Sequence, residues 1–217
     1  HYPDTGLICL ENAHGSGKVA PLSYMKDVYN IAQEKNIPVH LDGARLFNAA
    51  TYLNVEAKEI TQYVDSVTFC LSKGLACPVG SMLCGSKTFI HKARRGRKML
   101  GGGMRQVGIL GAAGLVGLNK MVQRLHLDHE NADYLASKLS QIKELDVDND
   151  RLDINMVFVK SSIDFLDLEN FMLTKGIKIS GYKGEVLRLA IHNDIKRDDI
   201  DYLIKNIHEY ISKHSHE

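Results

Sequence analysis

The stretch Pro38–Arg45 (PVHLDGAR) decides the fold, because a short apolar run ends there in a charged turn. Runs of the same form, bounded by polar residues, occur at three other places: Gly6–Leu10 (GLICL), Ser66–Leu71 (SVTFCL) and Val79–Cys84 (VGSMLC). Short apolar runs of this kind are typical of strands that are buried in a mostly parallel sheet. The sequence therefore predicts four strands of such a sheet.

Helical segments alternate with these runs. Ser23–Lys35 carries apolar residues at the spacing of one helix face, and Ser23 is placed to cap that helix. Further helices are predicted at Asn54–Gln62, at Lys87–Arg97, and at Gln106–Leu125 with a break at Asp128 before Ala132–Ile142. Alternating strands and helices predict an α/β layer architecture.

The pattern changes at the acidic segment Asp146–Arg151 (DVDNDR). Beyond it, strands are predicted at Ile154–Lys160 and Val186–Ile191, and helices at Leu166–Lys175 and Asp198–Ser212. This order is typical of a small α+β domain. We therefore expect residues 1–148 to form part of a large domain and residues 149–217 to form a small C-terminal domain.

Composition excludes several classes of protein. Of the 217 residues, 44% are hydrophobic and 24% are charged, as in ordinary globular domains, and the net charge of +1 does not indicate a nucleic-acid binder. The apolar runs are much shorter than the roughly 20 residues of a membrane helix. The four cysteines lie in apolar runs without metal-type spacing, which predicts reduced thiols in a cytoplasmic protein and no metal site. Because the chain begins at His1 without Met, we expect a piece that starts inside a domain.

Charged residues at strand ends are the first candidates for chemistry, because open parallel sheets bind ligands there. Asp42 follows one run and Lys73 follows another, while Arg188 interrupts VLRLAI. A carboxylate at a strand end is stabilised by a cation such as a protonated pyridine nitrogen, and a desolvated lysine forms an imine with an aldehyde. This pairing is characteristic of pyridoxal 5'-phosphate sites. Spacing alone also fits solvated residues in glycine-bounded loops.

Four ordered segments extend the argument: Leu10–Val28 (LENAHGSGKVAPLSYMKDV), His40–Ala50 (HLDGARLFNAA), Asp65–Ser86 (DSVTFCLSKGLACPVGSMLCGS) and Arg97–Leu115 (RKMLGGGMRQVGILGAAGL). Together they resemble successive motifs of the threonine aldolases, a branch of the fold-type I pyridoxal-phosphate enzymes. The resemblance implies an α/β large domain of the aspartate aminotransferase type, with a mostly parallel sheet and a small C-terminal α+β domain. It also implies pyridoxal 5'-phosphate as the cofactor.

The resemblance assigns roles to four residues. It implies that Lys73 holds the cofactor covalently and that Asp42 binds the pyridine nitrogen. Arg45 would contact the cofactor or the substrate carboxylate, although a surface salt bridge is the alternative. Arg188 matches the arginine that holds the amino-acid carboxylate, a task that suits a planar bidentate donor.

Other residues are matched with alternatives left open. Lys98 and Arg105 match positions near the cofactor phosphate, commonly supplied by a neighbouring subunit, although Lys98 also fits a solvated helix face. His1 matches a histidine near the substrate β-hydroxyl, where a neutral imidazole could accept a proton; a frayed terminal residue is the alternative. For His14, a loop histidine that satisfies backbone groups is the preferred interpretation.

The segment Gly15–Lys18 (GSGK) superficially resembles a phosphate-binding loop. It lacks the first glycine at the required distance and a Ser or Thr after Lys18, so we reject that interpretation.

The implied activity is that of a carbon–carbon lyase, which cleaves L-threonine or L-allo-threonine to glycine and acetaldehyde and so serves glycine biosynthesis. A homotetramer with shared active sites is implied as well. One alternative is a related β-eliminating lyase of aromatic amino acids. Another is a non-catalytic fragment that needs a complementary N-terminal segment, because the phosphate-binding loop and ring-stacking histidine of the family lie upstream of His1.

Overall fold

The structure is a computed structural model that describes residues 1–214. It divides into two units. The first comprises His1–Gly15 and Val19–His126, and the second comprises Ser16–Lys18 and the chain from Leu127 onward. The chain therefore passes between the units at three places. The second unit begins well before the acidic segment at which the sequence places the domain edge, because the helix ahead of that segment packs into the second unit's core.

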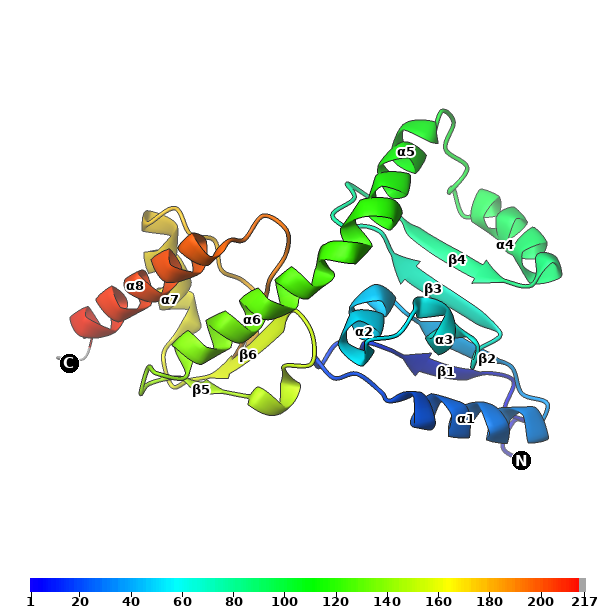
Figure 1. Cartoon of the computed structure of the whole chain (residues 1–217), viewed down its shortest axis with the longest axis horizontal. Helices are drawn as coiled ribbons and strands as arrows, with labels where there is room; N and C mark the ends of the chain where they lie inside the picture. Colours follow the sequence, from blue (N-terminus) through cyan, green and yellow to red (C-terminus); the bar gives the residue numbers. More distant parts are fainter. Residues whose placement is uncertain (215–217) are drawn as a thin grey trace. The chain divides into compact units, whose positions relative to one another are not determined.

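The first unit contains the four strands that the apolar runs predict. They lie in the order β1 (Ile8–Glu11), β2 (Val39–Asp42), β3 (Ser66–Cys70) and β4 (Ser81–Gly85). The first three strands are parallel, and β4 runs antiparallel to β3 (Figure 1). The mostly parallel sheet is thereby confirmed.

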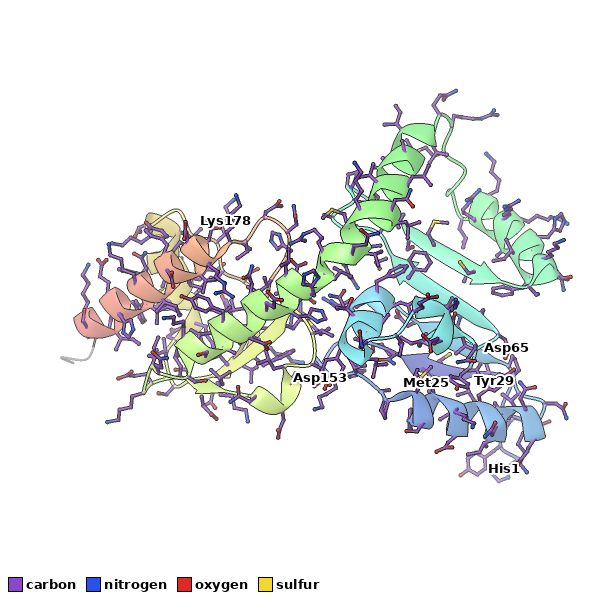
Figure 2. The ribbon with its side chains drawn as sticks, in the orientation of Figure 1. His1, Met25, Tyr29, Asp65, Asp153 and Lys178 are labelled. Carbon is purple, nitrogen blue, oxygen red and sulfur yellow. The ribbon has the colours of Figure 1, made fainter. Side chains whose placement is uncertain are left out.

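Three helices pack on one face of this sheet: α1 (Leu22–Glu34), α2 (Leu46–Leu53) and α3 (Ala57–Thr61). Leu41 and Val67, which are paired in register, are buried on that face. The rings of Phe47 in α2 and Phe69 in β3 meet edge to face at 5.3 Å. Met25 of α1 is fully buried and is labelled in Figure 2. Right-handed crossovers between parallel strands place consecutive helices on one side of a sheet in this way.

The helices of the first unit differ from the sequence prediction at two places. Ser23 does not cap α1, because the helix already begins at Leu22 after Pro21. The helix α2 was not predicted, since its N-cap residue Arg45 makes no capping side-chain hydrogen bond and gives no start signal in the sequence.

The long helical stretch continues through Asp128, where a break was expected. The helix α4 (Lys87–Met99) comes first and is followed by a connection. The chain then runs through four consecutive helical segments: α5 (Gly108–Val116), a π-helical turn (Gly117–Met121), a 3₁₀ turn (Val122–Arg124) and α6 (Leu125–Leu139). Asp128 is fully buried within α6. The irregularity lies instead at Gly117, where a Cβ would lie 2.5 Å from the Sγ of Cys77.

The second unit has an antiparallel sheet in the order β5 (Asp146–Val147), β6 (Met156–Lys160), β8 (Val186–Ala190) and β7 (Tyr182–Lys183). A 3₁₀ turn (Asn149–Arg151) precedes β6, and α7 (Phe165–Thr174) and α8 (Arg197–His214) complete the unit. Its apolar core joins α6, the sheet and both later helices through residues such as Leu135, Val157 and Met172. The small α+β architecture is thus as expected. Within residues 1–214, the helices are too short or too polar to cross a membrane.

An ion-pair cluster between α7 and α8 predicts the acid sensitivity of the second unit. The ammonium groups of Lys175 and Lys213 each lie 2.8 Å from Oε1 of Glu209 and lower its pKa from 4.5 to about 2. A carboxyl with a lowered pKa stabilises the fold above its ordinary pKa, and this contribution is lost as the pH falls from 4.5 toward 2. We expect Glu209→Gln to lower the thermal midpoint at pH 7 and to match the wild type near pH 2. Thermal unfolding across that pH range checks this, with Glu144→Gln, an exposed site in the same unit, as control.

Candidate active site

Asp42 and Lys73 lie at the same edge of the first sheet. Asp42 is the last residue of β2, and Lys73 follows the end of β3 by three residues. Because β2 and β3 are parallel neighbours, their carboxyl ends meet at one edge. The two residues on which the sequence argument depends are therefore on adjacent turns.

The turn after β2 is fixed by hydrogen bonds and by crowding. The N–H of Ala44 donates to Oδ1 of Asp42 at 3.0 Å, and the N–H of Gly43 donates to the carbonyl of Thr68 at 2.7 Å. A Cβ at Gly43 would lie 3.1 Å from that carbonyl, so a larger residue would push the turn away from β3. Arg45 follows as the half-buried N-cap residue of α2.

The turn after β3 is equally constrained. The carbonyl of Lys73 accepts the N–H of Ala76 at 2.9 Å, and Ala76 has a positive φ of 55°. Gly74 is buried, and a Cβ there would lie 2.9 Å from Cδ2 of Leu125 and 3.0 Å from Oδ1 of Asn48. These contacts hold Lys73 in a tight turn whose shape depends on the glycine beside it.

Asp42 and Lys73 are both exposed, whereas the sequence argument expected them to be poorly hydrated. The reason is that Asp42 points to the face of the sheet opposite α1, α2 and α3, and Lys73 lies beyond the strand. Their chemistry still fits a pyridoxal coenzyme. A carboxylate for the ring nitrogen and an amine for the aldehyde lie at neighbouring strand ends. Each is followed by a glycine at which an added Cβ would lie too close to neighbouring atoms.

The three other predicted cations lie elsewhere on the two units. Lys98 lies in the last turn of α4, and its side chain packs against Gly103. Arg105 is exposed in the connection between α4 and α5. Arg188 is an exposed residue of β8 in the second unit. It lines a cavity of about 650 Å³ within that unit, together with Lys178, which is labelled in Figure 2.

The two candidate histidines flank β1 at opposite ends. His1 precedes the strand, is exposed and stacks on Tyr2, and Figure 2 shows it at the outside of the first unit. His14 follows the strand's carboxyl end, with its Nε2 3.4 Å from Oε2 of Glu11. Since Glu11 pairs with Asp42 in register, the structure brings His14, and not His1, to the edge that carries Asp42.

Asn12 is a residue of this edge that the sequence analysis did not single out. It is fully buried, and its N–H donates to the carbonyl of Asp42 at 3.1 Å. A polar residue shortly after an apolar run was the available signal, and the same signal had identified Asp42 and Lys73. It was missed at Asn12 because an uncharged amide suggests no chemistry.

Comparison with known proteins identifies the family. A sequence model described as beta-eliminating lyase matches residues 1–162. The chain belongs to the beta-eliminating lyase family. A low specificity L-threonine aldolase of Escherichia coli O157:H7 is 44% identical over 201 residues, which cover 92% of this chain and 59% of that protein. The chain thus spans about three-fifths of the length of this relative.

Comparison with solved structures identifies the fold of this chain. A putative aromatic amino acid beta-eliminating lyase/threonine aldolase from Exiguobacterium has a TM-score of 0.82 at 23% identity, covering 96% of this chain and 63% of that one. A PLP-dependent aminotransferase from Streptococcus suis has a TM-score of 0.71 at 17% identity, covering 95% and 57%. The expected fold of the aspartate aminotransferase type is confirmed.

The crowding at Gly74 gives a prediction about the Lys73 turn. We expect Gly74→Ala to lower the free energy of unfolding by about 1–3 kcal/mol, because the new methyl group must displace Leu125 or Asn48. Urea unfolding measures this. Gly6→Ala is the matched control, since a Cβ there meets open space. Equal midpoints for the two variants would contradict the proposed packing.

Proposed function

We propose that the whole protein is a pyridoxal 5'-phosphate-dependent threonine aldolase. The observation that carries the proposal is the pair Asp42 and Lys73 on adjacent turns at the carboxyl edge of parallel strands. The likeness to a relative named low specificity L-threonine aldolase supports the substrate class. The proposed reaction is the retro-aldol cleavage of L-threonine or L-allo-threonine to glycine and acetaldehyde.

Four residues of the first unit would hold the coenzyme. The amine of Lys73 would bind its aldehyde carbon, and the carboxylate of Asp42 would bind its ring nitrogen. The cations Lys98 and Arg105 have the charge to bind its phosphate, and both are exposed. When bound, the coenzyme supplies an electron sink beside the substrate's α-carbon.

The substrate would be oriented by arginines. Arg188 and Arg45 each present a planar guanidinium that suits a carboxylate, and fixing the carboxylate fixes the direction of the Cα–Cβ bond that breaks. A histidine would accept the proton of the β-hydroxyl. The family resemblance suggested His1 for this step, whereas position at the strand edge favours His14.

Assembly and location complete the proposal. Exposed apolar side chains gather at α5 and the connection before it, where Leu100 is 90% and Ile109 is 80% exposed. An exposed apolar group of this extent is typical of an interface, which supports a homotetramer with shared sites. The four cysteines are free, in keeping with a reducing cytoplasm, and glycine release would serve glycine biosynthesis.

Two other functions are distinguishable by product. An aromatic β-eliminating lyase would release ammonia and pyruvate from tyrosine or tryptophan, whereas the aldolase releases acetaldehyde from threonine. A non-catalytic chain would release neither without its upstream segment. We favour the aldolase because of the similarity to the aldolase from Escherichia coli.

Lys73 provides the decisive test. After incubation with pyridoxal 5'-phosphate and borohydride reduction, peptide mapping should find the coenzyme on Lys73. Lys73→Ala should abolish threonine cleavage, and Asp42→Asn should lower kcat by about 10²- to 10³-fold, because a neutral amide cannot keep the ring nitrogen charged. Lys92→Ala, at an exposed lysine of α4, is the control. Modification of another lysine, with activity retained in Lys73→Ala, would refute the proposal.

The exposed apolar group gives a separate prediction about assembly. We expect Ile109→Asp to dissociate the oligomer, because a carboxylate cannot be desolvated at an apolar interface without a partner. Sedimentation at micromolar concentration measures the change. Lys143→Asp, an exposed site of the second unit, should leave the mass unchanged. A wild-type monomer would contradict the assembly.

A further inference from the structure

The turn that carries Lys73 is closed by the backbone of Cys77. The N–H of Cys77 donates to the carbonyl of Leu71 at 3.1 Å, and the N–H of Ala76 donates to the carbonyl of Lys73 at 2.9 Å. The N–H of Leu71 in turn donates to the carbonyl of Gly80 at 2.9 Å. Because Lys73 lies between Leu71 and Cys77, a shift of Cys77 is passed to the backbone from which the amine of Lys73 extends.

The side chain of Cys77 attaches this turn to α5, which belongs to the same unit. Cys77 is buried, and its Sγ lies 3.4 Å from the carbonyl oxygen of Ala113 and 3.6 Å from that of Leu75, so the thiol hydrogen can bond to either. The carbonyl of Ala113 also accepts the N–H of Gly117, the residue after α5. The thiol thus shares an acceptor with the helix at the point where the π-helical turn begins.

Two buried glycines let the helical stretch and the turn approach this closely. A Cβ at Gly114 would lie 3.3 Å from Cδ1 of Leu71. A Cβ at Gly117 would lie 2.5 Å from Sγ of Cys77 and 3.2 Å from the carbonyl oxygen of Leu75. Residues three apart share one face of a helix, and π-helical turns occur frequently at functional sites. One face of the helical stretch is therefore shaped to receive the turn that carries the candidate lysine.

We propose that the contacts of Cys77 with Ala113 and Gly117, which we name the seat, position Lys73 for the coenzyme. Cys77 and Gly117 are positioning residues, because they act through the turn that carries Lys73. The inference rests on the proposed function, in which the amine of Lys73 binds the coenzyme's aldehyde carbon. Such a reaction requires the two reacting atoms to approach to about 3–3.5 Å in the correct direction, so the placement of the turn affects its rate.

The seat complements the packing around Gly74. Gly74 directly follows Lys73, and a Cβ there would lie close to Leu125 and Asn48. Those contacts hold the residue next to the lysine, whereas the seat holds the far end of the turn at Cys77. With both places held, the backbone of Lys73 has little freedom to move away from the strand end.

The test uses three variants of the whole protein and three controls. Cys77→Ala removes the thiol donor, Cys77→Ser keeps a donor at that position, and Gly117→Ala places a methyl group against Sγ. Gly96→Ala controls for a methyl group added within a helix, because a Cβ there meets open space. Cys84→Ala, at an exposed cysteine of β4, controls for the loss of a thiol. Ile60→Val shortens a fully buried side chain of α3 and controls for a loss of stability.

Two measurements report on the seat. In the coenzyme-free protein we expect amide hydrogen exchange of residues 73–77 to be about tenfold faster in Cys77→Ala and Gly117→Ala than in the wild type. The rate at which Lys73 captures pyridoxal 5'-phosphate, followed by visible absorbance and borohydride trapping, should fall by about tenfold to a hundredfold in both variants. Cys77→Ser should stay within about threefold of the wild-type rate, because a hydroxyl still donates to the carbonyl.

Positioning is separated from stability by the controls. We expect the thermal midpoint to fall in Cys77→Ala, which loses a hydrogen bond, and in Gly117→Ala, which crowds the turn. All rates are therefore measured well below the lowest midpoint. In the double variant Cys77→Ala/Gly117→Ala the new methyl group meets no sulfur, so the two losses of rate should be less than additive. A purely structural role would slow capture by Lys73 no more than Ile60→Val does.

Two results would overturn the proposal: exchange of residues 73–77 equal to that of Gly96→Ala and Cys84→Ala, or capture slowed no more than in Ile60→Val. Wild-type protein that takes up the coenzyme on Lys73 but cleaves no threonine would instead refute the proposed aldolase function and leave the seat standing. Coenzyme found only on another lysine would overturn both.

Discussion

The parallel pairing of β2 with β3 is the constraint on which the candidate site depends. Leu41 pairs with Val67 and Asp42 with Thr68, so the buried apolar pair and the functional edge share one register. A slip of one residue would move Leu41 out of the core and turn Asp42 to the opposite face. The hydrophobic core therefore fixes where the carboxylate points, and the site needs no separate device to align its two turns.

Much of the first unit could be predicted because its signals are local. Each strand corresponds to one apolar run; Asp42 directly follows PVHL, and Lys73 comes one residue after SVTFCL. The helix α2 was not predicted, because its start lacks a capping side chain. The continuous helix through Asp128 was not predicted either, because burial of that residue overrides its weak helix propensity. Local pattern identified the elements, while packing set their ends.

Long-range contacts and the exposure of the site residues could not be predicted from local signals. Arg151 bonds to Ser16 across 135 positions of sequence, and nothing near either residue indicates the other. Burial was also misjudged for Asp42 and Lys73, since an apolar run implies a buried strand but says nothing about the residues that follow it. What distinguishes these two residues from ordinary exposed charges is therefore their position on adjacent, rigid turns.

Three glycines in connecting turns share one physical role. A Cβ would crowd the carbonyl of Thr68 at Gly43, Leu125 and Asn48 at Gly74, and Arg151 with Phe158 at Gly17. Each glycine lets another segment approach a connecting turn more closely than any side chain would permit. In the sequence, Gly17 looked like part of a failed phosphate loop, because a glycine chosen for close approach to a ligand and one chosen for close approach to another chain segment have the same spacing signature. The geometry separates them: the neighbours of Gly17 are protein atoms, so this glycine lets its loop pack closely against Arg151 and Phe158.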